Sequence, residues 1–171
     1  MSRFDFILQK ILTIDQAKQR SALWKMKNEK LVFTNGCFDI IHAGHVTYLA
    51  KAASFGNRLI IGLNDDASVR VQNKDVNRPI NDEESRALVL AALGFVDAIV
   101  LFNDSTPLKL IEELRPDVLI KGGDYDASEK DSSSKRFIVG SDFVRSCGGT
   151  VETIDLVQGF STTNILSKLK K

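Results

Sequence analysis

The sequence predicts a three-layer α/β domain in which helices cover both faces of a parallel sheet of five strands. Short unbroken apolar runs alternate along the chain with longer segments of helical periodicity. Such runs are typical of strands that are buried on both faces, as they are in a parallel sheet. The chain has 171 residues, which is enough for about one domain with its own core.

Each expected element has a local signal. The five expected strands are the apolar runs at residues 31–34, 58–63, 98–102, 117–121 and 150–154. The expected helices cover residues 14–28, 44–55 and 162–170, and two more begin after Asn81 and after Thr106-Pro107. We expect residues 1–30 to form an N-terminal helical extension and residues 31–171 to form the main domain.

Capping residues mark where three of these helices begin. Thr13–Gln16 has the form of a capping box, and Asn81–Glu84 has the same spacing. Thr106-Pro107 places a cap residue and a first-position proline where helices favour them. Residues 124–136, rich in Asp, Ser and Lys, have little to bury, so we expect a mobile loop that could act as a lid.

The charge balance and cysteine content exclude several function classes. The 23 basic and 22 acidic residues give a net charge of +1, so the chain is not a nucleic-acid binder that works by bulk charge. Cys37 and Cys147 have no paired spacing, and the first residues lack a secretory signal, which indicates a reducing compartment. The most apolar stretch, residues 88–102, is too short to span a bilayer. We therefore expect a cytoplasmic protein with neither a nucleic-acid nor a membrane partner.

The segment after the first expected strand carries most of the chemistry. Gly36 permits a tight turn and a close approach of the backbone to a ligand. Both histidines of the chain, His42 and His45, follow at the start of the next helix, where free N–H groups and the positive end of the helix dipole favour an anion. Two imidazoles there can donate hydrogen bonds to a phosphate whose charge grows during a displacement.

Other interpretations of the histidines stay open at this point. A histidine near a helix start can cap the helix or pack against it. Cys37, His42 and His45 could also form a zinc site, although no carboxylate stands at a motif spacing. The chain has neither a Walker-type phosphate loop nor a dinucleotide-binding glycine fingerprint, so those two modes of nucleotide binding are excluded.

Two motifs together resemble a known family. Asn35–Asp39 followed by His42–His45, with Ser161–Ile165 near the end of the chain, resembles the nucleotidylyltransferases of the cytidylyltransferase-like superfamily. Within it, Arg78–Asn81 and Lys121–Tyr125 are most similar to the D-glycero-β-D-manno-heptose 1-phosphate adenylyltransferases. The similarity covers nearly the whole main domain and implies a Rossmann-like fold. Many relatives are fused to a sugar kinase, so the chain resembles the stand-alone form.

The resemblance implies roles for the matching residues. His42 and His45 would contact the nucleotide phosphates and stabilise the pentacoordinate α-phosphate. The implied nucleotide site is lined by Thr34, Asn35, Gly36, Cys37 and Phe38, with Gly123 and Asp124 near the base and ribose, and Ser161, Thr162 and Thr163 at the β and γ phosphates.

Five further residues are implied to contact phosphate or substrate. Arg86 would face the phosphates, and Lys121 belongs to the motif that follows the fourth expected strand. Relatives carry a Lys-Gly pair in the loop after the second expected strand. The loop is one residue longer here, so the resemblance implies that either Arg70 or Lys74 takes its phosphate-binding role. Asp65 could touch a metal or the sugar hydroxyls.

The implied reaction is transfer of AMP from ATP to D-glycero-β-D-manno-heptose 1-phosphate, by in-line attack at the α-phosphorus, for lipopolysaccharide core synthesis. Mg²⁺ would be carried by the triphosphate rather than by a protein cage. Two alternatives stay open: cytidylyl or adenylyl transfer to glycerol, ethanolamine or pantetheine phosphate, and a non-catalytic nucleotide-binding module. The resemblance also implies a homodimer, in which Trp24 and Met26 could lie at the interface unless they pack on the sheet.

Overall fold

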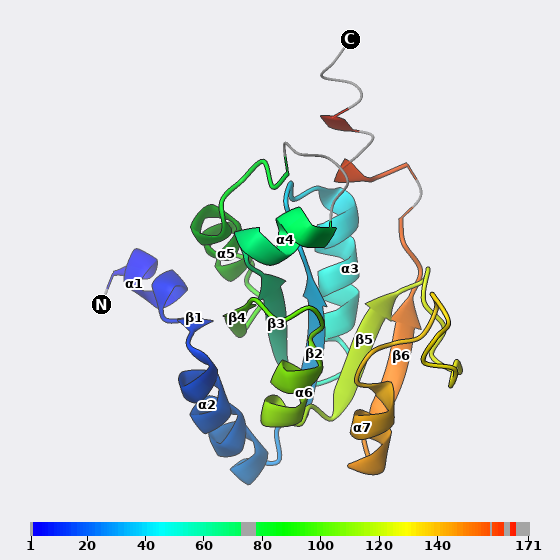
Figure 1. Cartoon of the computed structure of the whole chain (residues 1–171). Helices are drawn as coiled ribbons and strands as arrows, with labels where there is room; N and C mark the ends of the chain where they lie inside the picture. The colour runs from blue at the N-terminus through cyan, green and yellow to red at the C-terminus, as the bar shows by residue number, and fades with distance from the viewer. Residues whose placement is uncertain (1, 73–77, 158, 163–164, 167–171) are drawn as a thin grey trace.

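The fold is a three-layer α/β domain around one sheet of parallel strands, as the sequence predicted (Figure 1). The structure, a computed structural model, describes residues 2–72, 78–157, 159–162 and 165–166. The strands, all paired in parallel in the order β1-β4-β3-β2-β5-β6, are β1 (Ile11–Leu12), β2 (Leu31–Gly36), β3 (Arg58–Asn64), β4 (Ala98–Phe102), β5 (Val118–Gly122) and β6 (Thr150–Ile154).

The sheet has six strands in the described part of the chain, so the prediction of five was wrong by one. The additional strand is β1, which has two residues and pairs at the sheet edge with Ile99 and Val100 of β4. A strand this short has no periodicity to detect, because alternation needs at least four residues. The five predicted strands are all present.

Helices cover both faces of the sheet (Figure 1). On one face lie α2, α6 and α7; on the other lie α3 and α5, with α1 beside α5. Their bounds, with α4 at the carboxyl ends of the strands, are α1 (Arg3–Leu8), α2 (Ile14–Met26), α3 (Ala43–Ala53), α4 (Asp66–Gln72), α5 (Glu83–Ala91), α6 (Leu108–Leu114) and α7 (Ser141–Ser146).

The predicted helix starts are confirmed in one case and displaced in two. Thr13 caps α2 and forms the predicted capping box with Gln16. Helix α5 is capped by Asp82 rather than by Asn81, because Asn81 is engaged elsewhere in the site described below. Helix α6 begins one residue later than predicted, with Pro107 at the cap position and no side-chain cap bond.

Three short helices, α1, α4 and α7, were missed by the sequence analysis. Each has six or seven residues, which is fewer than two turns and too few for a helical repeat to show. The predicted helix at residues 162–170 lies mostly outside the described residues. In the described part of the chain, no helix is long and apolar enough to cross a membrane.

Two hydrophobic clusters fill the space on either side of the sheet. Alternate residues of each strand point to opposite faces, so neighbouring residues such as Val32 and Phe33 belong to different clusters. One cluster joins the sheet to α2, α6 and α7, and the other joins it to α3 and α5. Burial on both faces explains why the strands read as unbroken apolar runs.

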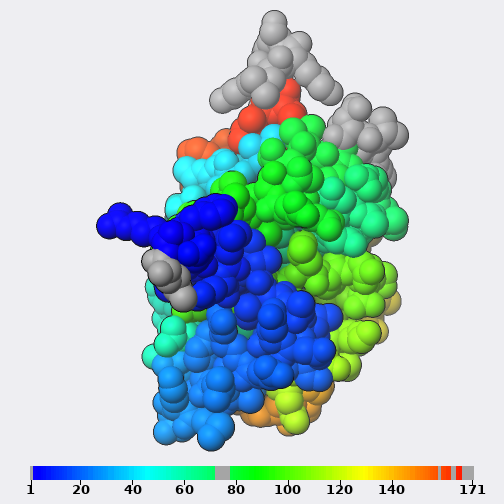
Figure 2. Space-filling model, turned by 90° about the vertical axis from the view of Figure 1, so that its left-hand side faces the viewer, coloured from blue at the N-terminus to red at the C-terminus, as the bar shows by residue number. Residues whose placement is uncertain are grey.

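Residues 1–30 pack as part of the same sheet assembly. Figure 2 shows this N-terminal segment, in blue, spread over one side of the molecule. Trp24 lies in the core and contacts the guanidinium of Arg58, 5.4 Å from the ring centroid. Arg58 also pairs with Glu29 at 2.6 Å and with Asp97 at 2.9 Å. Trp24 therefore packs on the sheet, whereas the neighbouring Met26 is 81% exposed.

Candidate active site

The order of the strands places a binding crevice between β2 and β5. From β2 the chain builds the sheet toward β3 and β4, and from β5 it builds the sheet in the other direction toward β6. Ligands of open α/β sheets bind at the carboxyl ends of the strands, at the point where the order reverses. The starts of α3 and α4 and residues 155–157, directly after β6, lie above this edge of the sheet (Figure 1).

A pocket of about 280 Å³ lies at this edge. Its walls come from the end of β2 and the loop after it, the first turns of α3, the end of β5, and the segment after β6. The lining residues are Asn35, Gly36, Cys37, Phe38, His42, Gly44, His45, Tyr48, Lys121, Gly122, Leu156, Val157, Phe160, Ser161 and Thr162. Nine of the predicted site residues are therefore brought together in one pocket.

The two histidines form a stacked pair at the start of α3. His42 is the N-cap of the helix, and its Nδ1 accepts the backbone N–H of His45 at 3.3 Å. The two ring centroids are 3.8 Å apart with 16° between the planes. The edge of the Phe38 ring meets the His45 ring, with 5.3 Å between centroids and 67° between planes. Both histidines line the pocket, so the capping role of His42 and a role toward a ligand are compatible.

Both imidazoles are held in the neutral form at pH 7. Burial, followed by the neighbouring His42, lowers the pKa of His45 to about 4. Burial also lowers the pKa of His42. A neutral imidazole still carries one N–H donor. The helix start therefore offers imidazole donors and free backbone N–H groups to an anion, without two adjacent positive charges.

Lys121 and Tyr48 line the side of the pocket next to β5. Burial lowers the pKa of Lys121 to about 8, and its Nζ lies 5.1 Å from the centroid of the Tyr125 ring. Tyr48, which the sequence analysis missed, shares a 2.7 Å hydrogen bond with the hydroxyl of Thr34 and donates to the carbonyl of Ile120 at 3.3 Å. Thr34 is fully buried and does not line the pocket.

The segment after β6 closes the other side of the pocket. Leu156, Val157 and Phe160 give it an apolar wall that the sequence analysis did not anticipate, and Ser161 and Thr162 supply hydroxyls. The Phe160 ring lies 6.2 Å from that of His42, at 29° between planes. Gly44 makes this approach possible, because a Cβ there would lie 2.9 Å from the Cβ of Phe160. Thr163 lies outside the described residues.

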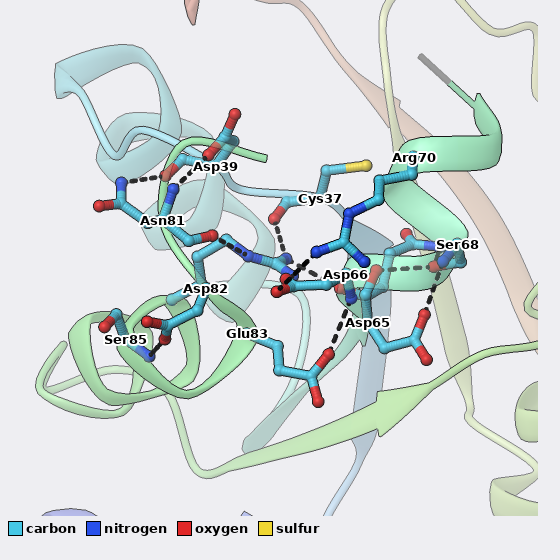
Figure 3. A network of polar contacts seen from close by, with 12 residues as sticks. Cys37, Asp39, Asp65, Asp66, Ser68, Arg70, Asn81, Asp82, Glu83 and Ser85 are labelled. Atoms are coloured by element: carbon cyan, nitrogen blue, oxygen red, sulfur yellow. Dashed lines mark hydrogen bonds and ion pairs between the residues drawn. The ribbon is translucent and has the colours of Figure 1, made fainter. Parts of the chain in front are cut away.

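Arg86 does not face the pocket, which corrects the expectation that it contacts phosphates. Its side chain has no exposed surface. Nη1 donates to the carbonyls of Cys37 at 2.6 Å and Asn64 at 2.8 Å, and Nε donates to the carbonyl of Asn81 at 3.1 Å. Nη2 pairs with Asp66 at 2.7 Å (Figure 3). Four of its five donors are thus used by the protein itself.

Asp39, the last residue of the first motif, is a second buried anchor. Its Oδ1 accepts the backbone N–H groups of Ile80 at 2.8 Å and Asn81 at 3.1 Å, and its Oδ2 pairs with Arg78 at 2.9 Å. The side-chain amide of Asn81 donates to the backbone carbonyl of Asp39 (Figure 3). The Arg78–Asn81 motif therefore fixes the loop that carries the histidines.

A single family model matches the part of the chain that contains both motifs and most of the sheet. The family model described as Cytidylyltransferase-like matches residues 33–165. The chain belongs to the cytidylyltransferase-like family. This confirms the resemblance that the two motifs predicted, and the matched region contains the whole pocket.

Curated relatives of this cytidylyltransferase-like chain are longer proteins. The chain is 52% identical over 160 residues to the bifunctional protein HldE of Magnetococcus marinus, and 48% identical over 163 residues to that of Pseudomonas fluorescens. These matches cover 94% and 95% of the chain but 31% of each relative. The chain thus spans about a third of the length of the curated relatives it matches.

Two solved structures resemble the cytidylyltransferase-like fold described above. The crystal structure of the lipopolysaccharide core biosynthesis protein from Thermoplasma volcanium has a TM-score of 0.56 and 27% identity, and the match covers 75% of this chain and 97% of that one. Pantoate-beta-alanine ligase from Francisella tularensis has a TM-score of 0.59 and 14% identity, with 94% and 76% covered. The second is a likeness of fold alone.

The remaining predicted residues in the described part of the chain do not line the cytidylyltransferase-like pocket. Arg70 is largely exposed and lies 3.7 Å from the Asp66 carboxylate. Asp65 accepts the backbone N–H of Ser68 in the first turn of α4 at 2.7 Å, so one carboxylate oxygen serves the helix. Gly123 and Asp124 are exposed just beyond β5 and do not line the pocket. Lys74 lies outside the described residues.

The donor set of the pocket determines which metals it suits. None of its lining residues is a carboxylate. Among the described residues, no group of three or more His, Cys, Asp and Glu could hold a metal ion. Imidazoles, hydroxyls and one lysine are donors that suit an anion.

Proposed function

We propose that the chain is an adenylyltransferase that moves AMP from ATP to D-glycero-β-D-manno-heptose 1-phosphate. The observation that carries the proposal is the stacked pair of His42 and His45 at the start of α3, facing a pocket that Ser161 and Thr162 also line. A triphosphate in this pocket would meet donors from both sides. The identity to bifunctional HldE proteins and the likeness to a lipopolysaccharide core biosynthesis protein support a sugar phosphate of that core as acceptor.

The proposed reaction is a direct in-line displacement. An oxygen of the sugar 1-phosphate attacks the α-phosphorus of ATP, the bond from that phosphorus to the bridging oxygen of pyrophosphate breaks, and pyrophosphate leaves with the bonding electrons. A phosphate dianion is already a nucleophile, so no proton has to be removed first. The enzyme contributes alignment and stabilisation of the charge that develops on the α-phosphate oxygens.

The roles of the pocket residues follow from their positions. The neutral imidazoles of His42 and His45 donate to the α-phosphate, where charge grows in the transition state. Asn35–Phe38 line the nucleotide, and Ser161, Thr162 and Thr163 hold the β and γ phosphates. Lys121 adds a positive charge beside them, because a pKa of about 8 leaves most of its amines protonated at pH 7. Arg70 or Lys74, with Asp65, would bind the acceptor, as the family resemblance implies.

Mg²⁺ enters the proposed reaction as the counter-ion of ATP. The pocket offers it no carboxylate, so the triphosphate oxygens and water would supply its ligands. Excess chelator should then abolish turnover by removing the Mg–ATP substrate, without unfolding the protein. Full turnover in excess chelator would contradict this part of the proposal.

Pyrophosphate release across a small matrix of substrates tests the proposed function. ATP and CTP are each offered with heptose 1-phosphate, glycerol phosphate, ethanolamine phosphate and pantetheine phosphate. The proposal expects the highest kcat/KM for ATP with heptose 1-phosphate. A higher value for another pair would assign the chain to that reaction, and ATP binding without product in any combination would indicate a non-catalytic module.

A pair of variants on α3 links the activity to this pocket. His45→Ala removes a donor to the transition state and is expected to lower kcat by about 10²–10³-fold. Lys51→Ala is the matched control, because Lys51 is exposed on the last turn of the same helix, away from the pocket. Equal turnover in the two variants would refute the assignment of His45.

A further inference from the structure

We infer that Phe38 is a positioning residue whose strained backbone sets the orientation of the His45 ring. Two buried charges, Asp39 and Arg86, hold Phe38 in that conformation. The kinetic consequence rests on the proposed function, whereas the structural consequence can be measured without it.

The backbone of Phe38 is left-handed, with φ +46°. A bulky L-residue rarely adopts this conformation, because its Cβ crowds the following carbonyl oxygen. Among the described residues, the other non-glycine residues with positive φ are Asn28 and Arg115. Arg115 is the C-cap of α6 and Asn28 lies one residue beyond the C-cap of α2, at helix ends where left-handed residues are common. Phe38 stands in the loop between β2 and α3, so a helix end does not account for its conformation.

The residues on both sides of Phe38 are fixed by side chains that have no exposed surface. On one side, the carbonyl of Cys37 accepts Nη1 of Arg86 at 2.6 Å. On the other side, the carboxylate of Asp39 accepts two backbone N–H groups and pairs with Arg78. A strained residue persists where its surroundings determine it from more than one direction. The contacts of Cys37 and Asp39, the residues before and after Phe38, determine its conformation from both directions.

The two anchors are also connected to one another. The backbone carbonyl of Asn81 accepts a hydrogen bond from Nε of Arg86. The backbone N–H and the side-chain amide of Asn81 both donate to Asp39. The loop before α5 thus acts as a common support for both sides of Phe38. These bonds belong to the network of polar contacts drawn in Figure 3.

The left-handed turn directs the Phe38 ring to His45. The ring is buried, and its edge meets the His45 imidazole at 5.3 Å between centroids. Gly36 leaves the space for this, because a Cβ there would lie 3.0 Å from Cε2 of Phe38. The His45 ring is therefore held on its face by His42, at 3.8 Å, and by the edge of Phe38 on another side.

The two histidines of the chain make this arrangement measurable by NMR. Their imidazole Hε1 protons give two resonances, which single His→Gln variants assign and whose pH titration reports how buried each ring is. In the wild-type chain, the pKa of His45 is about 4. Phe38→Gly removes the ring but retains a residue that tolerates positive φ. We expect it to raise the pKa of His45 toward 6.5, its ordinary value, and to lower kcat about 10²-fold.

A double-mutant cycle tests whether the anchors act through Phe38. Arg86→Lys cannot reach the same set of oxygens with a single ammonium group, so we expect it to raise the pKa of His45 in the wild-type background. In the Phe38→Gly background, Arg86→Lys should change the pKa of His45 little further, because the Phe38 ring through which Arg86 acts is absent. Circular dichroism before each titration verifies that the variants are folded. If Arg86→Lys does not fold, Asp39→Asn replaces it in the cycle.

Asn28→Gly is the matched control for the backbone change. It replaces another left-handed residue, which precedes β2 and so lies at the opposite end of that strand from the pocket, and should leave the His45 titration unchanged. A wild-type titration of His45 in Phe38→Gly would overturn the inference, as would full additivity of the two effects in the cycle. If the wild-type chain releases no pyrophosphate, the proposed function fails, and the titrations alone decide the role of Phe38.

Discussion

The imidazole rings of His42 and His45 lie face to face, with 3.8 Å between their centroids and 16° between their planes. The stack arises because His42 caps α3 and accepts the backbone N–H of His45. One ring is therefore fixed by the backbone of the residue that carries the other. Burial lowers the pKa of both rings, and the neighbouring His42 lowers that of His45 further.

The double role of His42 leads to the first prediction. His42→Ala removes both the cap and the imidazole, so we expect it to lower the free energy of unfolding by about 1 kcal/mol and kcat by about 10²–10³-fold. His42→Asn retains a side chain that caps helices well, so the free energy of unfolding should stay close to that of the wild type. Its kcat should fall as much as in His42→Ala, because the imidazole is absent from both variants. Urea unfolding and pyrophosphate release measure the two effects. Normal turnover in His42→Asn would limit His42 to capping.

The buried histidine also leads to a prediction for stability against pH. The pKa of His45 in the folded chain, about 4, lies below the 6.5 of an exposed imidazole. Between these values the unfolded chain binds more protons than the folded chain, so protons favour unfolding. The free energy of unfolding should therefore be unaffected by His45 above about pH 6.5 and should decrease as the pH falls from 6.5 toward 4. Urea unfolding at several pH values measures this slope.

His45→Gln isolates the contribution of this one group. Glutamine cannot titrate, so the variant should lose less stability than the wild type between pH 7 and pH 5. Carboxylates contribute mainly at lower pH, which is why the comparison stops at pH 5. Identical slopes for the two proteins in this range would contradict the assigned burial of His45.

The sequence was sufficient to predict the layers, the five strands and the pocket residues Gly36, His42 and His45 from local signals, whereas the other six of the nine pocket residues were implied by the family resemblance. Unbroken apolar runs follow from burial on both faces of the sheet, and the motif around Gly36 stands directly after a strand that the topology places at the crevice. The capping box of α2 likewise depends on residues three apart. Such features can be predicted because their causes lie within a few residues of one another.

The features that were missed depend on contacts between distant residues. Arg86 contacts Cys37, 49 positions away, and no local pattern shows that its guanidinium is buried there rather than free for a phosphate. Tyr48 enters the pocket through its bond to Thr34 across two elements. The apolar wall at Leu156 and Phe160 depends on how the chain after β6 folds back over α3. The contacts of these residues could be identified only from the three-dimensional structure.

The N-terminal segment gives a prediction about domain structure. Trp24 packs in the core on the α2 side of the sheet, so Trp24→Ala is expected to lower the free energy of unfolding by about 3–5 kcal/mol. Met26, two residues further on the same helix, is 81% exposed, and Met26→Ala should change the free energy of unfolding by less than about 0.5 kcal/mol. Thermal and urea unfolding compare them. A small effect of Trp24→Ala would show that residues 1–30 are separable from the sheet.

The last prediction concerns Gly44 in the first turn of α3. Replacing a helical glycine by alanine ordinarily stabilises a protein by about 0.5–1 kcal/mol. Here an added Cβ would lie 2.9 Å from the Cβ of Phe160 and 3.0 Å from the His42 ring. Gly44→Ala should therefore lower the free energy of unfolding by about 1–3 kcal/mol and, by displacing His42, lower kcat as well. Gly94→Ala is the matched control, since nothing lies within 4 Å of its added Cβ. If Gly44→Ala stabilised the protein and retained full turnover, the close approach of Phe160 to the start of α3 would not exist in solution.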